Sequence, residues 1–232
     1  MVTRRPRTAP AALALLALLA AGGLSACGDD AETGTADDTS TSASAGTDGG
    51  DGTDDPEGAG STEDSQEVST DQVTLRLPGG WESLDAEEAL AQADGEDGTL
   101  ASIAERLGVP PEQLEATLQN VDLVAVADGG AQDGVLTNVN VLHQSGELPG
   151  EDEFAAQLEQ FADTTGDVAT VEAPVGDVLR ADYQLDINGT AGQFEVLLAQ
   201  VGGDVVTITV TSADAADAAE VADLVVATLD AA

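Results

Sequence analysis

The chain has 232 residues, with 45 Asp or Glu against 6 Lys or Arg, and its formal net charge at pH 7 is -39. A surface this negative repels phosphate backbones and anionic headgroups, which disfavours nucleic-acid binding and electrostatic membrane docking but leaves cations and basic partners compatible. Cys27 is the only cysteine, which excludes an internal disulfide, a CxxC redox pair and a multi-cysteine zinc site.

Residues 1–26 have the three parts of an export signal, in the order that export machinery reads. Arg4, Arg5 and Arg7 form a basic start, followed by an apolar stretch over about residues 11–21 and by a small-residue exit. The apolar stretch is shorter than the roughly 20 residues that cross a bilayer, so we predict a cleaved signal peptide and not a membrane helix. The export route, general secretion or twin-arginine, stays open.

The signal ends in Leu24-Ser25-Ala26-Cys27. This run resembles the lipobox of bacterial lipoproteins, in which a leucine and two small residues precede an obligatory cysteine. The resemblance implies that the Cys27 thiol takes a diacylglyceryl group through a thioether, and that a dedicated peptidase recognises Leu24, Ser25 and Ala26 and cuts before Cys27. Palmitate-type acyl chains would then hold the protein at the extracytoplasmic face of the cell membrane, each buried CH₂ adding about 0.8 kcal/mol. The alternative is an ordinary signal peptide with an incidental cysteine.

Residues 27–67 are predicted to form a disordered acidic linker that carries the lipidated Cys27 at its start. After Cys27 the segment consists mostly of Gly, Ser, Thr, Asp and Glu, with alanines and Pro56 as its apolar residues. Such a composition cannot offset the roughly 1–2 kcal/mol per residue needed to order a backbone. Its acidic clusters do not fit the spacing of an EF-hand loop, so no metal site is predicted here.

Residues 68–232 are predicted to form one α+β domain, because large apolar residues return there with clear periodicity. An alternating strand over 73–77 ends at Pro78-Gly79-Gly80, just before Trp81. Helical patterns follow over 85–93, 100–107 and 111–118. All five aromatic residues of the chain lie in this domain: Trp81, Phe154, Phe161, Tyr183 and Phe194.

The second half of the domain predicts a sheet with helices packed against it. An apolar run over 121–127 and a strand over 135–143 precede an amphipathic helix over 151–162, whose apolar stripe requires a partner. Glycine turns at 188–189 and 202–203 predict that the strands on either side of each turn pair antiparallel. In the strand over 179–187, apolar and polar residues alternate so regularly that one face of the strand should be exposed to solvent. These strands are expected over 179–187, 193–201 and 205–211, and a last helix over about 214–229.

The order of elements is strand, helices, two strands, helix, three strands, helix. Together with the run from Thr74 to Trp81, Thr-Leu-Arg-Leu-Pro-Gly-Gly-Trp, this order resembles the Mog1/PsbP-like lipoproteins, including the LpqN/LpqT group of actinobacterial envelopes. The resemblance implies a mainly antiparallel sheet flanked by helices and a role in binding or assembly. It supplies no catalytic motif.

The residue inventory argues against an enzyme. His143 is the only histidine, and no free thiol remains once Cys27 is lipidated, which argues against nucleophilic catalysis of the serine–histidine or cysteine–histidine type. We expect His143 to be a structural residue at the end of its strand. Paired carboxylates could in principle cleave glycosidic bonds, but any pair among 45 acids is uninformative. No catalytic residue, cofactor or metal is predicted.

Three residues form a weak hypothesis for a binding surface: Trp81, Arg76 and Arg180. Trp81 follows the Pro-Gly-Gly turn and is expected either to pack against the core or to be exposed at a surface that binds a partner. Arg76 and Arg180 fall on the solvent side of their strands by alternation, where ordinary surface ion pairs are the simpler explanation.

The leading functional hypothesis is a membrane-anchored, non-catalytic binding or scaffold module of the cell envelope. Its partners would be the membrane, through the lipid, and an envelope protein or glycolipid, but no nucleic acid. The alternative is a lipid or glycolipid carrier with an apolar cavity, and a hydrolase is the third hypothesis.

Overall fold

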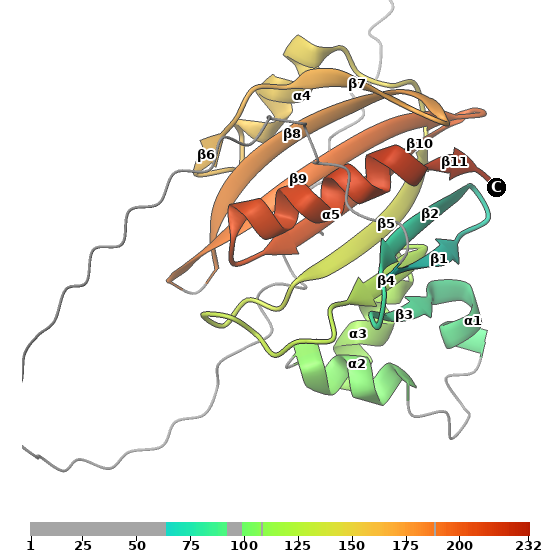
Figure 1. Ribbon diagram of the computed structural model, residues 1–232, viewed down its shortest axis with the longest axis vertical. Helices are drawn as coiled ribbons and strands as arrows, with labels where there is room; N and C mark the ends of the chain where they lie inside the picture. The colour runs from blue at the N-terminus through green and yellow to red at the C-terminus, as the bar shows by residue number, and fades with distance from the viewer. Residues whose placement is uncertain (1–63, 92–98, 108, 188) are drawn as a thin grey trace, which may run out of the picture. The chain divides into compact units, whose positions relative to one another are not determined.

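The computed structural model describes residues 64–91, 99–107, 109–187 and 189–232 (Figure 1). The predicted signal peptide, the lipobox with Cys27 and the linker up to residue 63 lie outside these residues. Within the described part of the chain, no helix combines the length and the apolar character needed to cross a membrane.

The described residues form an α+β fold built on an eight-stranded antiparallel sheet. The strands over 176–187, 190–201 and 204–212 follow one another in the chain, and each pairs antiparallel with the next, as expected. The strand order is β3 (Glu82–Asp85), β4 (Leu123–Val126), β5 (Asn138–Ser145), β10 (Asp204–Ser212), β9 (Thr190–Val201), β8 (Gly176–Ile187) and β6 (Thr164–Thr165), with β7 (Ala169–Ala173) also paired to β8.

A small second sheet and one long helix cover one face of the large sheet. The small sheet has the order β1 (Ser65–Ser69), β2 (Val73–Pro78), β11 (Asp230–Ala231), and α5 (Ala215–Thr228) lies beside β2 and across β9 and β10 (Figure 1). The other helices are α1 (Ala86–Ala91), α2 (Thr99–Leu107), α3 (Pro111–Leu118) and α4 (Glu151–Leu158). The predicted architecture, an antiparallel sheet flanked by helices, is confirmed.

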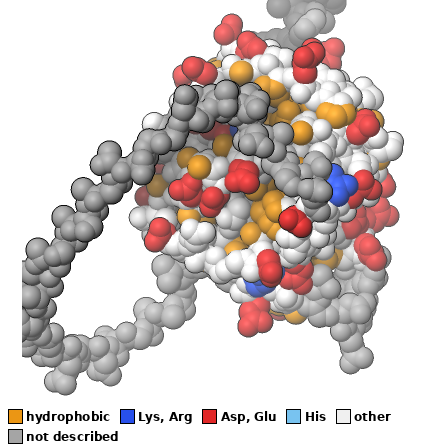
Figure 2. Space-filling view, viewed as in Figure 1, with side chains coloured by type: hydrophobic (Ala, Val, Ile, Leu, Met, Phe, Trp, Pro, Cys, Tyr) orange, Lys and Arg blue, Asp and Glu red, His pale blue; other side chains and the backbone are white. Residues whose placement is uncertain are grey.

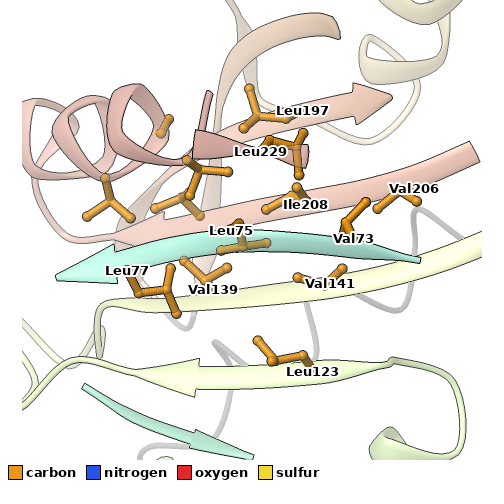
Figure 3. Packing of buried hydrophobic residues seen from close by; sticks show 14 of the residues in the cluster. Val73, Leu75, Leu77, Leu123, Val139, Val141, Leu197, Val206, Ile208 and Leu229 are labelled. Atoms are coloured by element: carbon orange, nitrogen blue, oxygen red, sulfur yellow. The ribbon is translucent and has the colours of Figure 1, made fainter. Parts of the chain in front are cut away.

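The main core lies between β2 and the large sheet. Leu75 and Leu77 of β2 share this cluster with Val139 and Val141 of β5 and with Ile208 of β10 (Figure 3). All five side chains are at most 1% exposed. Because alternate residues of β2 face this layer, the strand holds the turn that follows it at a fixed place on the sheet.

A second cluster confirms the prediction that the 151–162 helix packs on the sheet. Phe154 of α4 is fully buried and shares an apolar cluster with Tyr183 and Phe194. The Tyr183 and Phe194 rings stack with centroids 4.8 Å apart, and Phe161 meets Tyr183 edge-on at 5.5 Å. The regular helix ends at Leu158, four residues earlier than predicted, and a turn carries Phe161 onto the cluster.

The predicted end of the linker at residue 67 is wrong, because Ser65, Gln66 and Glu67 belong to β1. Only Val68 in this strand is apolar and buried, so composition does not reveal it. The strand is held by its ladder to β2 and by Arg76, whose guanidinium donates to the Ser65 hydroxyl at 2.7 Å and to the Ser65 carbonyl oxygen at 2.8 Å.

Candidate binding groove

A groove of about 330 Å³ opens where three distant segments of the chain meet, and Trp81 lines it. The volume lies at the small end of the range of ligand pockets, roughly 300–1,000 Å³. Its walls come from the turn after β2 (Pro78, Trp81), the connection between β4 and β5 (Ala127, Gln132, Thr137) and one side of α5 (Asp217, Glu220, Val221, Leu224).

The turn after β2 fixes the position of Trp81. The Gly79 backbone N–H donates to the Asp64 carbonyl oxygen at 2.6 Å, and a Cβ at Gly79 would lie only 2.7 Å from that oxygen, so the turn excludes a side chain there. Gly80 adopts a φ of +83°, which favours glycine. The Gln66 side-chain amide then donates to the Trp81 carbonyl oxygen at 2.6 Å. Trp81 itself is half-buried and packs against the main core.

The opposite wall is a stripe of α5 in which two acids are followed by two aliphatic residues at helical spacing. Asp217, Glu220, Val221 and Leu224 are three, one and three residues apart, which places them on one side of a helix. Val221 and Leu224 are each 7% exposed, whereas both acids are exposed. Asp214 caps the helix, since its carboxylate accepts from two backbone N–H groups of the first turn. The groove therefore has an apolar base and a negative edge.

No arginine of the described chain neutralises that edge. Arg106 pairs with Glu82 at 3.0 Å, and Arg76 lies 4.0 Å from Glu67. Arg180 pairs with Glu195 and with Asp223, which is on α5 but does not line the groove. Acidic side chains are spread over the face seen in Figure 2, with Arg at a few isolated places.

The structure separates the three residues of the predicted binding surface. Trp81 packs against the core and also lines the groove, so its side chain is neither fully buried nor fully exposed. Arg76 and Arg180 do not line the groove. Both take part in ion pairs, which was the simpler expectation for them.

Arg180 joins two strands to α5. Its Nε donates to Glu195 Oε2 at 2.8 Å across the β8–β9 pair, and its Nη1 donates to Asp223 of α5. The Glu195 side chain is only 10% exposed and that of Arg180 22%. Burial alone would lower the pKa of Arg180, but the hydrogen bonds to the two carboxylates outweigh it and raise this pKa, so the guanidinium stays charged.

His143 lies in a second hollow, of about 500 Å³, lined by residues of α1, α3 and β5. Its Nδ1 is 2.8 Å from Asp122 Oδ2, and the imidazole is 40% exposed. The hydrogen bond to Asp122 raises the pKa of His143 above its ordinary value of 6.5, against a smaller opposing effect of burial, and Asp204 and Asp71 add to the increase. His143 is near the end of β5, as expected, with a carboxylate as its partner.

We predict that NMR titration of His143, the single histidine, will show a pKa above 6.5 that falls in Asp122→Asn. Because the folded-state pKa is raised, protonated His143 stabilises the fold at pH values below about 6.5, and this contribution is lost as pH rises through the folded-state pKa. Asp71→Asn, which removes a weaker and more distant charge, should lower the pKa less. Equal pKa values in Asp122→Asn and the parent would contradict this assignment.

Sequence reasoning identified Trp81 from the turn before it but missed the other walls of the groove. The acids of α5 were part of the predicted last helix, yet nothing in the sequence marked them as part of a groove. Spacing would have placed Asp217 and Glu220 beside Val221. In the described part of the chain, no group of three His, Cys, Asp or Glu side chains is placed to hold a metal ion.

No protein-family model and no curated protein sequence matches this chain. Among solved structures, the chain is similar to LpqN of Mycobacterium tuberculosis, described as involved in cell envelope biogenesis, with 9% sequence identity and a TM-score of 0.36. The likeness covers 47% of this chain and 71% of LpqN.

Proposed function

We propose that this protein is a lipid-anchored, non-catalytic binding module at the extracytoplasmic face of the cell membrane, and that the Trp81 groove receives an envelope partner. The proposal combines two features. The run from Leu24 to Cys27 supplies a site for the lipid, and the groove supplies a binding surface on the folded part.

The single observation that carries the binding role is the placement of Trp81. A glycine turn and a hydrogen bond from the Gln66 side chain to the Trp81 carbonyl oxygen hold this residue half-buried, with its side chain packed against the core and lining an open groove. Tryptophan is enriched at the energetic centres of protein interfaces, because it buries a large area with few rotatable bonds. An aromatic residue held rigidly at a groove is therefore suited to binding.

A carrier of a lipid or glycolipid is the second candidate, supported by an unusual polar pair in the large sheet. Asn140 of β5 and Thr209 of β10 face each other in the strand register and are fully buried. Asn140 Oδ1 and Thr209 Oγ1 have no hydrogen-bond partner, although buried polar atoms normally do. A lipid retained on the domain after purification from its host would favour this role.

Site-specific photo-crosslinking in the native host tests the anchored binding module. A photoreactive residue at Gln132, on the groove wall, should crosslink to an envelope component in the membrane fraction, and one at the exposed Asp152 of α4 should not. Trp81→Ala should keep membrane partition and lose the Gln132 crosslink. Cys27→Ser should no longer incorporate labelled palmitate, because the thioether cannot form.

Two outcomes would contradict the proposal separately. If Cys27→Ser is processed and partitions with membranes like the parent, the anchor is wrong. If the Gln132 position gives no product, or gives the same product in Trp81→Ala, the groove is not the surface that binds.

A further inference from the structure

We infer that the occupant of the Trp81 groove is a positively charged side chain, arginine or lysine, carried by a basic segment of a partner protein. The inference rests on the proposed function and deepens it by naming the chemistry of the partner. It is carried by the charge, the aromatic wall and the size of the groove.

Charge complementarity is the first argument. Asp217 and Glu220 are exposed on the α5 side of the groove, and the Asp128 carboxylate lies beside Gly80, next to Trp81. None of the described arginines lines the groove, and each is paired with a carboxylate outside its lining, so the described part of the chain offers the groove no cation. An anionic ligand would be repelled, whereas a basic one gains from both acids at the edge.

The aromatic wall supplies the second argument. The face of an indole ring attracts a cation, and tryptophan does so better than tyrosine or phenylalanine, by about 0.5–1 kcal/mol at exposed sites. In this groove the half-buried Trp81 lies across from the aliphatic side chains of Val221 and Leu224. The carbon stem of an arginine or lysine can pack on such apolar surface while its charged end reaches the two acids.

The size of the groove selects among basic ligands. About 330 Å³ of space suits one long side chain and is at the lower limit for a small-molecule site. A single side chain in a groove this shallow needs further contacts from its own backbone for useful affinity, which a segment of a partner protein provides and a free amino acid does not.

Trp81 is the only tryptophan of the chain, so its fluorescence reports directly on the groove. The mature chain, beginning at residue 27 and carrying Cys27→Ser, is titrated with a capped Gly-Ser-Arg-Gly-Ser-Arg-Gly peptide. The comparison peptide carries citrulline, a neutral isostere, in place of each arginine. The arginine peptide should shift the Trp81 emission with saturation and bind about tenfold more tightly than the citrulline peptide, with binding weakened by NaCl.

Matched charge variants test whether binding depends on the acids of the groove or on the net negative charge of the whole protein. Asp217→Asn with Glu220→Gln should weaken binding at least about fivefold. Asp152→Asn with Glu153→Gln removes the same charge from an exposed part of α4 and should leave binding within about twofold of the parent. Both pairs change only exposed side chains, so folding is not at issue. Trp81→Phe, followed by calorimetry, should weaken binding while retaining an aromatic core contact.

Equal binding of the arginine and citrulline peptides, or equal weakening by the two charge pairs, would overturn the inference. The outcome for the proposed function is decided separately, by the crosslinking experiment. A Trp81-dependent crosslink from Gln132 without arginine-peptide binding would leave the groove as a binding surface with another occupant. Peptide binding without any crosslink would instead show a charge-selective groove that the envelope partner does not use.

Discussion

Arg180→Met is expected to lower the free energy of unfolding by about 3 kcal/mol, because it leaves a buried carboxylate without its cation. Glu195 of β9 is nearly enclosed, with its side chain 10% exposed, and Arg180 of β8 is its ion-pair partner at 2.8 Å. The substitution also removes the bond to Asp223, which joins α5 to the sheet. Urea denaturation followed by circular dichroism measures the loss.

A double variant shows whether the cost comes from the unpaired carboxylate. Arg180→Met combined with Glu195→Met removes both charges and should recover most of the lost stability, because apolar replacements of a buried ion pair are often near neutral. Glu67→Gln, which breaks an exposed pair with a side chain 67% exposed, should cost less than about 1 kcal/mol. A loss in Arg180→Met no larger than in Glu67→Gln would refute the structural role of this pair.

Arg180 also shows where sequence patterns reach their limit. Ala181 and Tyr183 of β8 are buried and Asp182 is exposed, in agreement with the alternation of apolar and polar residues along this strand. This alternation could not show that α5 covers the other face at one end of the strand, where Asp223 meets Arg180. Alternation reports which face a residue is on, and only the packing of distant elements determines how much of that face stays exposed.

The long elements were predictable because each is long enough to show a regular spacing of apolar residues along the chain. The helix at Pro111–Leu118 and the strands β8, β9 and β10 were found within a few residues of their ends. The strands missed by the sequence, among them β1, β3 and β7, are short or largely polar, and they are held by the ladders of their neighbours. Such edge pairing leaves little trace in the pattern of a single strand.

For the groove, sequence reasoning found the aromatic residue and not its surroundings. The Pro-Gly-Gly turn marked Trp81, because a large aromatic residue directly after a turn either packs against the core or lies at a surface that can bind a partner. Asp217 and Glu220 are far away in the chain and look like many other acids in it. They meet Trp81 only because β2 and α5 lie side by side on the large sheet (Figure 1).

Leu75→Ala tests whether this layer holds the groove in place, and it is expected to lower the free energy of unfolding by about 3 kcal/mol. Leu75 is 1% exposed and lies over β5 and β10 in Figure 3, so the substitution removes buried methyl groups and leaves a cavity between the sheets. Thr74→Ala, one residue earlier and on the other side of β2, is the matched control and should cost less than about 1 kcal/mol.

The same unfolding experiment has two independent signals. Trp81 fluorescence reports on the turn after β2, and circular dichroism reports on the whole domain. Because β2 packs on the core that unites the large sheet with α5, both signals should show one transition at the same urea concentration, and Leu75→Ala should move both by the same amount. If Leu75→Ala shifts only the fluorescence transition, β2 and its turn unfold as a separate unit, and the wall of the groove that carries Trp81 is not fixed by the core.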